Sequence, residues 1–269
     1  MNIRSISMTS SSSDQIFETI EGWQVLRLEE VDSTNLFLMR EQEHLKHSGR
    51  VVLAENQTKG RGRLGRSYVS LPGRHLTFSA VIHPGLPLAR IQGMALLAGI
   101  AVARVLETRS EGVRLKWPND VLIRGRKVCG ILVETREIEG ARHPVLILGI
   151  GLNTNGRSDE FPENLQGKLT TLEEECGPKV NREEIFRELL RKLSGILNEF
   201  RQEGMPPLLQ EWLQRAGVQG ERVCCLNGKR LTGTFESLSA EGFPVIRLDD
   251  GTRHVHLSGD LIPVEEKIL

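Results

Sequence analysis

Apolar and polar positions alternate with two different periods along the chain, and they predict both strands and helices. Seven short stretches either alternate apolar with polar residues or are apolar throughout, as half-buried and buried strands do. These strands are expected at residues 23–28, 50–55, 75–82, 113–116, 121–124, 127–134 and 145–151. Longer stretches with helical spacing or helix-capping residues predict helices. These helices are expected at residues 36–47, 88–109, 181–201 and 206–215.

Two of the helices have the clearest signals. In 88–109 one stripe of apolar side chains recurs at helical spacing. Its members are Ile91, Ala95, Ala98, Val102, Val105 and Leu106. In 181–201 Asn181 is the expected N-cap, and Glu184 stands at the capping-box position. Both helices therefore present one apolar face to a core.

The pattern changes after residue 217. Short strands follow one another at 221–226, 230–238, 243–248 and 253–257. Asn227-Gly228 and Asp250-Gly251 are typical hairpin turns between them. These ~50 residues predict a small all-β barrel, which is too small to be the catalytic body. The chain is long enough for one large unit and this smaller one.

Composition restricts the class of function. Lys and Arg balance Asp and Glu, 35 against 35, so bulk charge gives no reason to expect nucleic-acid binding. Aromatic residues make up only 4% of the chain, which also argues against a base-stacking surface. No apolar run approaches the length of a membrane span. We expect a protein that binds neither nucleic acid nor membrane.

The four cysteines contain no CxxC pair, so neither a zinc site nor a disulfide framework is expected. Free thiols favour a reducing compartment, and we expect a cytoplasmic protein. The Ser-rich start of the chain, residues 1–13, has the composition of a partly disordered terminus. A flexible arm is therefore expected before the first strand.

Residues 57–66 combine three glycines with three arginines and a lysine. Glycine lets a ligand approach the backbone closely, and arginine offers a fixed fork of donors for phosphate or carboxylate. Gly60, Gly62 and Gly65 match GxGxxG, but no helix is expected after Gly65, so a Rossmann site is not predicted. A cationic loop that binds an anion is one interpretation, and a solvated basic surface loop is the other.

Other polar side chains stand where predicted elements begin or end. Ser33, Thr34 and Asn35 precede or open a helix, where they form either a polar pocket or a simple cap. The sequence Lys116-Trp117-Pro118-Asn119-Asp120 places three polar side chains at a strand end.

Two further positions have two interpretations each. Lys127 begins the second arm of a hairpin, where it either faces solvent or serves a site. Asn153 follows a buried strand, where it is either a turn residue or a donor and acceptor for a base or sugar.

Five segments, taken in their order and spacing, resemble the motifs of biotin protein ligases. They are residues 32–35, Gln57 with 60–66, 116–120, 127–134 and 149–153. The resemblance extends from residue 22 to the C-terminus. It implies an α+β fold, with a mixed β-sheet and flanking helices related to class II aminoacyl-tRNA synthetases, followed by a small SH3-like β-barrel. The expected divisions are a flexible arm at 1–20, a catalytic domain at 21–217 and the barrel at 218–269.

The resemblance also implies an activity. Such enzymes use ATP and Mg²⁺ to activate biotin as biotinyl-5′-AMP with release of pyrophosphate. They then transfer biotin to a lysine of a biotin carboxyl carrier protein, a part of acetyl-CoA carboxylase. Regulatory members carry an N-terminal winged helix-turn-helix, whereas only about twenty residues precede the matching domain here. We therefore expect a monofunctional ligase without a repressor role, as a monomer or homodimer.

Specific residues acquire roles through this resemblance. The residues with catalytic roles are Lys127, Arg63 and Asp120. Those expected at biotin are Ser33, Thr34, Asn35, Gln57, Arg61, Gly62, Arg63 and Lys127. Those expected at ATP or the adenylate are Arg61, Arg63, Arg66, Tyr68, Lys116, Asn119 and Asn153. Asn119 and Asp120 are expected near Mg²⁺.

Two departures and two alternatives accompany the resemblance. Tyr68 stands where some members place a Trp that packs over adenine, and no arginine follows the last strand to contact the nucleotide.

A lipoate ligase or octanoyltransferase of the same superfamily would share the core but bind another acyl chain. A non-catalytic sensor of biotin or nucleotide is the alternative from another class.

Overall fold

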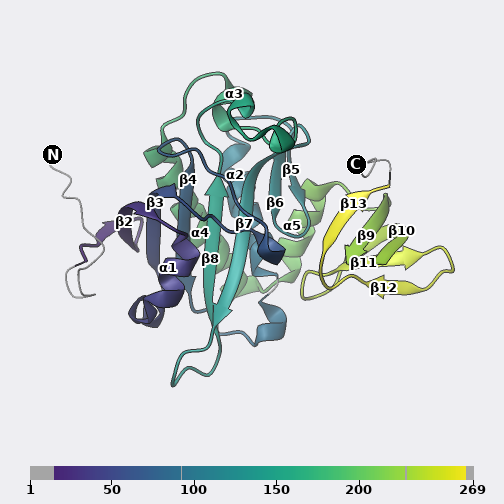
Figure 1. Cartoon of the computed structure of the whole chain (residues 1–269). Helices are drawn as coiled ribbons and strands as arrows, with labels where there is room; N and C mark the ends of the chain where they lie inside the picture. Colours follow the sequence, from purple (N-terminus) through teal and green to yellow (C-terminus); the bar gives the residue numbers. More distant parts are fainter. Residues whose placement is uncertain (1–14, 92, 228, 265–269) are drawn as a thin grey trace.

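The computed structural model describes residues 15–91, 93–227 and 229–264, whose strands form two sheets (Figure 1). The strands of the first sheet are β1 (Glu18–Ile20), β2 (Trp23–Val31), β3 (Arg50–Gln57), β4 (Leu76–Ile82), β5 (Val113–Lys116), β6 (Asp120–Ile123), β7 (Arg126–Arg136) and β8 (Val145–Leu152). The α-helices are α1 (Thr34–Arg40), α2 (Met94–Leu106), α3 (Leu172–Cys176), α4 (Arg182–Glu203) and α5 (Pro206–Ala216). The second sheet contains β9 (Arg222–Asn227), β10 (Lys229–Leu238), β11 (Pro244–Leu248), β12 (Arg253–Val255) and β13 (Asp260–Pro263).

The first sheet is mixed, as predicted. Its strand order is β1-β2-β3-β4-β8-β7-β6-β5. Strands β2 and β3 run parallel, and the other neighbours run antiparallel. The predicted α+β class, a large mixed sheet with flanking helices, is therefore confirmed.

Helices cover both faces of this sheet (Figure 1). Successive strand residues point to opposite faces, so neighbouring residues belong to different cores. Val25 and Val51 pack in the large cluster beneath α2, α4 and α5, whereas Leu26 and Val52 pack in a smaller cluster with Leu38 of α1. One face of the sheet therefore packs against α2, α4 and α5, and the other packs against α1.

Two predicted helices are shorter than expected. The helix predicted at 36–47 leaves helical backbone at Glu41 (φ −87°, ψ 67°), and a 3₁₀ turn over Gln42–Lys46 buries Leu45. The polar run 41–43 offers no apolar side chain to hold another α-helical turn on the core. The helix predicted at 88–109 becomes a 3₁₀ turn over Leu88–Arg90 followed by α2 after Gly93. A side chain at Gly93 would lie 3.1 Å from the Glu241 carbonyl oxygen, so glycine lets the second sheet approach closely.

The N-terminal arm expected over residues 1–20 needs one correction. Residues 1–14 lie outside the described part of the chain. Glu18–Ile20, however, form strand β1, which pairs with β2 at the edge of the main sheet, and Ile20 is buried. These three residues belong to the sheet rather than to a free arm.

The second sheet has five strands in the order β12-β11-β10-β9-β13. Its buried residues, including Phe235 and Leu261, join the large core, and Trp117 Nε1 donates to the Gly242 carbonyl at 3.1 Å. Gly228 of the predicted hairpin turn lies outside the described residues. A small all-β unit is thus present. The closure of this unit into a barrel and the domain boundary at 217/218 stay predictions.

Within the described ranges, no helix has the length and apolarity needed to cross a bilayer.

Candidate active site

One cavity of about 700 Å³ lies on the α1 face of the main sheet. Its wall contains every residue that the sequence singled out for catalysis or ligand binding. They are Ser33, Thr34, Asn35, Gln57, Arg61, Gly62, Arg63, Arg66, Tyr68, Lys116, Asn119, Asp120, Lys127 and Asn153. Segments up to 120 positions apart in the sequence, from Ser33 to Asn153, therefore meet in one place.

Glycines form the floor of this cavity. Gly130 of β7 pairs with Gly151 of β8, and Leu132 pairs with Gly149. A Cβ atom at Gly149 would lie 2.4 Å from Asn35 Oδ1, and one at Gly151 would lie 2.3 Å from Tyr68 Cζ. Both contacts are too short for any side chain, so glycine at these two positions makes room for Asn35 and Tyr68.

The start of α1 forms one end of the cavity. Ser33 occupies the N-cap position but its side chain makes no capping hydrogen bond. Instead Gln57 Oε1 accepts hydrogen bonds from the Thr34 amide at 2.8 Å and from the Thr34 hydroxyl at 3.2 Å. The Ser79 hydroxyl donates to Asn35 Oδ1 at 2.5 Å. The simple-cap interpretation is therefore wrong, because these buried side chains form a polar network that faces the cavity.

The arginine-glycine loop forms one wall. Hydrogen bonds close it on itself, from the Gly62 amide to the Arg66 carbonyl at 2.7 Å and from the Tyr68 amide to the Gly60 carbonyl at 2.9 Å. After the loop the chain is extended at Arg66, so the absence of a Rossmann helix after Gly65 is confirmed.

The second sheet holds two arginines of this loop. Both terminal nitrogens of Arg63 donate to the Gly259 carbonyl at 3.3 Å, and Arg66 forms an ion pair with Asp260 at 2.6 Å. Burial lowers the pKa of the Arg63 guanidinium, and Asp260 opposes that shift. Only part of the loop is therefore solvated, because 64% of the Arg66 side chain but only 25% of the Arg63 side chain is exposed.

A second cationic group lines the same cavity as the loop. Lys127 Nζ pairs with Asp120 Oδ1 at 2.6 Å, and both side chains are about three-quarters buried, with 30% and 25% exposed. The Lys127 backbone is fixed by hydrogen bonds to Lys168 and Thr170. Lys127 therefore faces the cavity, and its alternative as a solvent-facing hairpin residue is wrong.

The neighbouring Asn119 is also fixed, because its Nδ2 donates to the Ile131 carbonyl at 2.5 Å.

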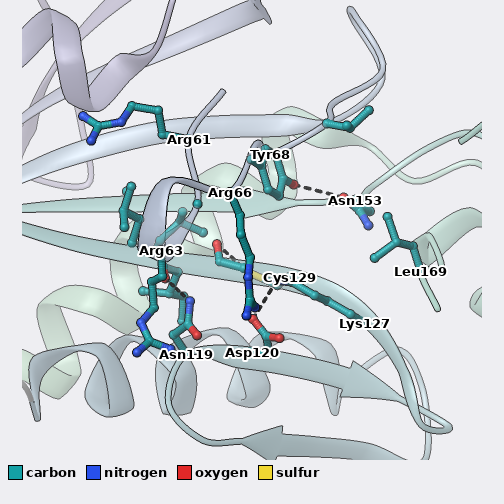
Figure 2. A pocket seen from close by; sticks show the side chains of 18 of the residues that line it. Arg61, Arg63, Arg66, Tyr68, Asn119, Asp120, Lys127, Cys129, Asn153 and Leu169 are labelled. Carbon is teal, nitrogen blue, oxygen red and sulfur yellow. Dashed lines mark hydrogen bonds and ion pairs between the residues drawn. The ribbon is translucent and has the colours of Figure 1, made fainter. Parts of the chain in front are cut away.

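Tyr68 and Asn153 form the remaining end of the cavity, apart from Arg63, Asn119 and Asp120 (Figure 2). Tyr68 Oη donates to Asn153 Oδ1 at 3.0 Å, and Asn153 Nδ2 donates to the Thr170 carbonyl at 3.0 Å. Burial raises the pKa of Tyr68 well above its ordinary value, so the hydroxyl stays protonated as a donor. Asn153 is thus held by two partners at the cavity wall.

Replacing Tyr68 with phenylalanine should distinguish the contribution of the hydroxyl to stability from that of the ring. The variant keeps the ring over Gly151 but loses the hydrogen bond to Asn153. We expect the free energy of unfolding to fall by about 1 kcal/mol, the usual contribution of one hydrogen bond. Urea denaturation of both proteins measures it, and an unchanged midpoint would show that the hydrogen bond contributes nothing.

Sequence reasoning did not predict the roles of several residues of the site. Gly149 and Gly151 alternate within a buried strand, a pattern that could have revealed a floor kept free of side chains. Ser79 is a hydroxyl inside an apolar strand and could likewise have been noticed. Glu134, although it ends the 127–134 motif, and Asp260 were given no role, because they meet the loop from distant parts of the chain.

The described residues contain no cluster of three or more His, Cys, Asp or Glu side chains arranged to hold a metal ion. Asp120 is the carboxylate expected there, with Asn119 beside it in sequence. One carboxylate fits Mg²⁺ that arrives with substrate phosphates, which commonly binds through one or two carboxylates. It does not fit a resident ion held by protein alone.

Comparison with known proteins decides the family. The profile of the biotin/lipoate A/B protein ligase family matches residues 28–153. The biotin–[acetyl-CoA-carboxylase] ligase of Mycobacterium tuberculosis is 30% identical over 259 residues, which cover 93% of this chain and 92% of that protein. The chain belongs to the biotin/lipoate A/B protein ligase family.

Two further members of this ligase family extend the comparison. The bifunctional ligase/repressor BirA of Bacillus spizizenii is 31% identical over 214 residues; these cover 77% of this chain but only 64% of BirA. The biotin protein ligase of Aquifex aeolicus, solved in complex with biotin and ATP, superposes with a TM-score of 0.74 at 33% identity. That match covers 88% of this chain and 97% of the Aquifex chain.

Proposed function

We propose that this family member is an ATP-dependent biotin protein ligase that forms biotinyl-5′-AMP and biotinylates a carrier protein. The supporting observation is that the residues expected for both substrates line a single cavity, with Lys127 and the loop arginines around it. The Aquifex relative was solved with biotin and ATP together, which supports the same pair of ligands here. The cytoplasm, where carboxylases and ATP are available, is the proposed location.

The polar end of the cavity suits the biotin ring system. Thr34, Asn35 and Gln57 offer neutral donors and acceptors from a buried, hydrogen-bonded network. A ureido group presents both N–H donors and a carbonyl acceptor, which such side chains match. Ser33 lies beside them in the cavity wall.

The cationic middle suits the reacting groups. In the first step, a carboxylate oxygen of biotin bonds to the α-phosphorus of ATP while the bond to pyrophosphate breaks. Two anions approach each other, so cations must offset their repulsion and stabilise charge in the transition state. We assign this role to Lys127 and to the loop residues Arg61, Gly62 and Arg63, which line the same cavity. Asp120 holds the Lys127 ammonium through an ion pair.

The nucleotide end is assigned to Arg66, Tyr68, Lys116, Asn119 and Asn153. The Tyr68 ring lies on the glycine floor, where it can pack against a base. Asn119 and Asp120 would hold Mg²⁺ carried by the triphosphate, which would neutralise phosphate charge. The second sheet is proposed to be an SH3-like barrel. Through Gly259 and Asp260 it contacts Arg63 and Arg66 of the arginine-glycine loop, which we propose covers this end.

In the second step, a lysine amine of the carrier attacks the carbonyl carbon of the mixed anhydride. A C–N bond forms, the C–O bond to AMP breaks, and the amine loses a proton. The loop would keep water from the anhydride until the carrier arrives.

Transfer to a carrier tests the whole activity. The protein, ATP, Mg²⁺ and biotin are incubated with a purified biotin carboxyl carrier domain, and the carrier is analysed by mass spectrometry. We expect one biotin on the acceptor lysine and none on a carrier whose acceptor lysine is replaced by arginine. Release of pyrophosphate without any modified carrier would leave adenylation standing and refute the transfer.

A further inference from the structure

Glu134 is a carboxylate that touches two parts of the site at once, and the functional residues discussed above do not include it. It lies on β7, on the same strand face as Gly130 and Leu132 of the cavity floor. One oxygen, Oε2, accepts from Asn35 Nδ2 at 2.8 Å. The other, Oε1, lies 3.2 Å from a terminal nitrogen of Arg61.

The contact with Asn35 fixes the orientation of that amide. A carboxylate is only an acceptor, so the Asn35 NH₂ group must face Glu134. The Ser79 hydroxyl donates to the opposite end, Asn35 Oδ1. One N–H and one oxygen lone pair of Asn35 then remain for a ligand, in directions that Glu134 and Ser79 determine.

The contact with Arg61 has a different character. The Arg61 side chain is 39% exposed, so the ion pair contributes little to folding stability. In Figure 2 Arg61 points away from Arg63, Arg66 and Lys127, the groups that surround the anion site. Arg61 also lines a second cavity of about 620 Å³ together with Glu134, so its side chain lies between two open spaces. To reach an anion in the first cavity, its guanidinium would turn away from Glu134.

We propose that Glu134 is a positioning residue of the acyl site. It orients Asn35 through one oxygen and holds Arg61 through the other, until the carboxylate of an acyl substrate replaces Glu134 as the partner of Arg61. The proposal rests on the proposed function, because it assigns Asn35 and Arg61 to the acid substrate. Binding then exchanges one carboxylate partner of Arg61 for another. Glu134 competes with a charged ligand for Arg61 but supports the binding of any ligand that uses Asn35.

Two substitutions separate these effects. In Glu134→Gln the side-chain oxygen can still accept from Asn35, but the charge that holds Arg61 is lost. In Glu134→Leu both contacts are lost. Glu137→Gln is the matched control, since it removes an exposed carboxylate just beyond the same strand.

Isothermal titration calorimetry without ATP compares biotin with its uncharged methyl ester. We expect Glu134→Gln to bind biotin two- to fivefold more tightly, about the effect of one exposed ion pair, and the ester unchanged. We expect Glu134→Leu to bind the ester about tenfold more weakly, because the buried Asn35 amide loses its partner, and biotin only two- to fivefold more weakly, because the release of Arg61 offsets part of that loss. Glu137→Gln should bind both like the unaltered protein.

Other results would overturn the proposal. If Glu134→Gln weakens both ligands or leaves biotin affinity unchanged, Arg61 is not exchanged. If Glu134→Leu leaves both affinities unchanged, Glu134 does not orient Asn35. Thermal denaturation of each variant shows that it is folded. Failure of the proposed acid substrate looks different, because the unaltered protein would then bind neither ligand, and failure of the proposed catalysis is seen separately as biotin binding without release of pyrophosphate.

Discussion

Replacing Lys127 with alanine is expected to slow adenylate formation about a hundredfold, because one preorganised cation at the transition state contributes on the order of 3 kcal/mol to the barrier. The Lys127 ammonium lies 2.6 Å from Asp120, faces the cavity and has a backbone fixed by hydrogen bonds on both sides. The variant also leaves Asp120 without its cation, which adds repulsion toward the phosphates. The rate is measured as pyrophosphate released in a single turnover.

Two controls accompany this prediction. Lys46→Ala removes an exposed lysine that pairs with Glu43, and it should leave the rate unchanged. Lys127→Arg keeps the charge and should recover part of the lost rate. Near-normal adenylate formation by Lys127→Ala would refute the catalytic role of this residue.

Replacing Gly151 with alanine should cause the largest loss of stability among small changes in the site. The added methyl group would lie 2.3 Å from Tyr68 Cζ and 2.6 Å from its hydroxyl oxygen, so the ring must leave the floor. The side chain is half-buried and hydrogen-bonded to Asn153. Forced displacement of this kind costs about 1–3 kcal/mol of unfolding free energy. Urea denaturation measures the loss.

The chain offers a matched control and a rescue for this substitution. Gly195 lies within α4, and a side chain there would meet nothing within 4 Å, so Gly195→Ala should be stabilising or neutral. In a Tyr68→Ala background, Gly151→Ala should cost much less than in the unaltered protein, because the clashing ring is gone. An equal cost in both backgrounds would contradict the packing explanation.

Local pattern was sufficient to predict most of the strands, because alternating or continuous apolar residues leave few other ways to bury them. The strand around residues 145–151 is an example, since β8 covers Val145–Leu152 and is buried throughout. The predicted end of the helix at 36–47 was wrong, because the point where a helix ends depends on which residues reach the core and not on spacing alone. The edge strand β1 was missed because its three residues gain their partner only in the folded sheet.

The site was predictable where its residues stand in dense local motifs, as in the arginine-glycine loop. It was not predictable where the chemistry depends on contacts between distant segments. The pairing of Arg66 with Asp260 joins residues 194 positions apart, and Asn35 meets Glu134 from 99 positions away. Spacing in the sequence gives no information on such pairs, although they determine which charges surround a ligand.

Pyrophosphate release with ATP, Mg²⁺ and three alternative acids tests the central claim most directly. Biotin, lipoate and octanoate are supplied separately at equal concentration, and the burst of pyrophosphate is measured for each. A biotin ligase should give a burst with biotin and only background with the other two. A burst with lipoate or octanoate alone would assign the protein to another branch of its family, and tight biotin binding without pyrophosphate would show a sensor rather than a ligase.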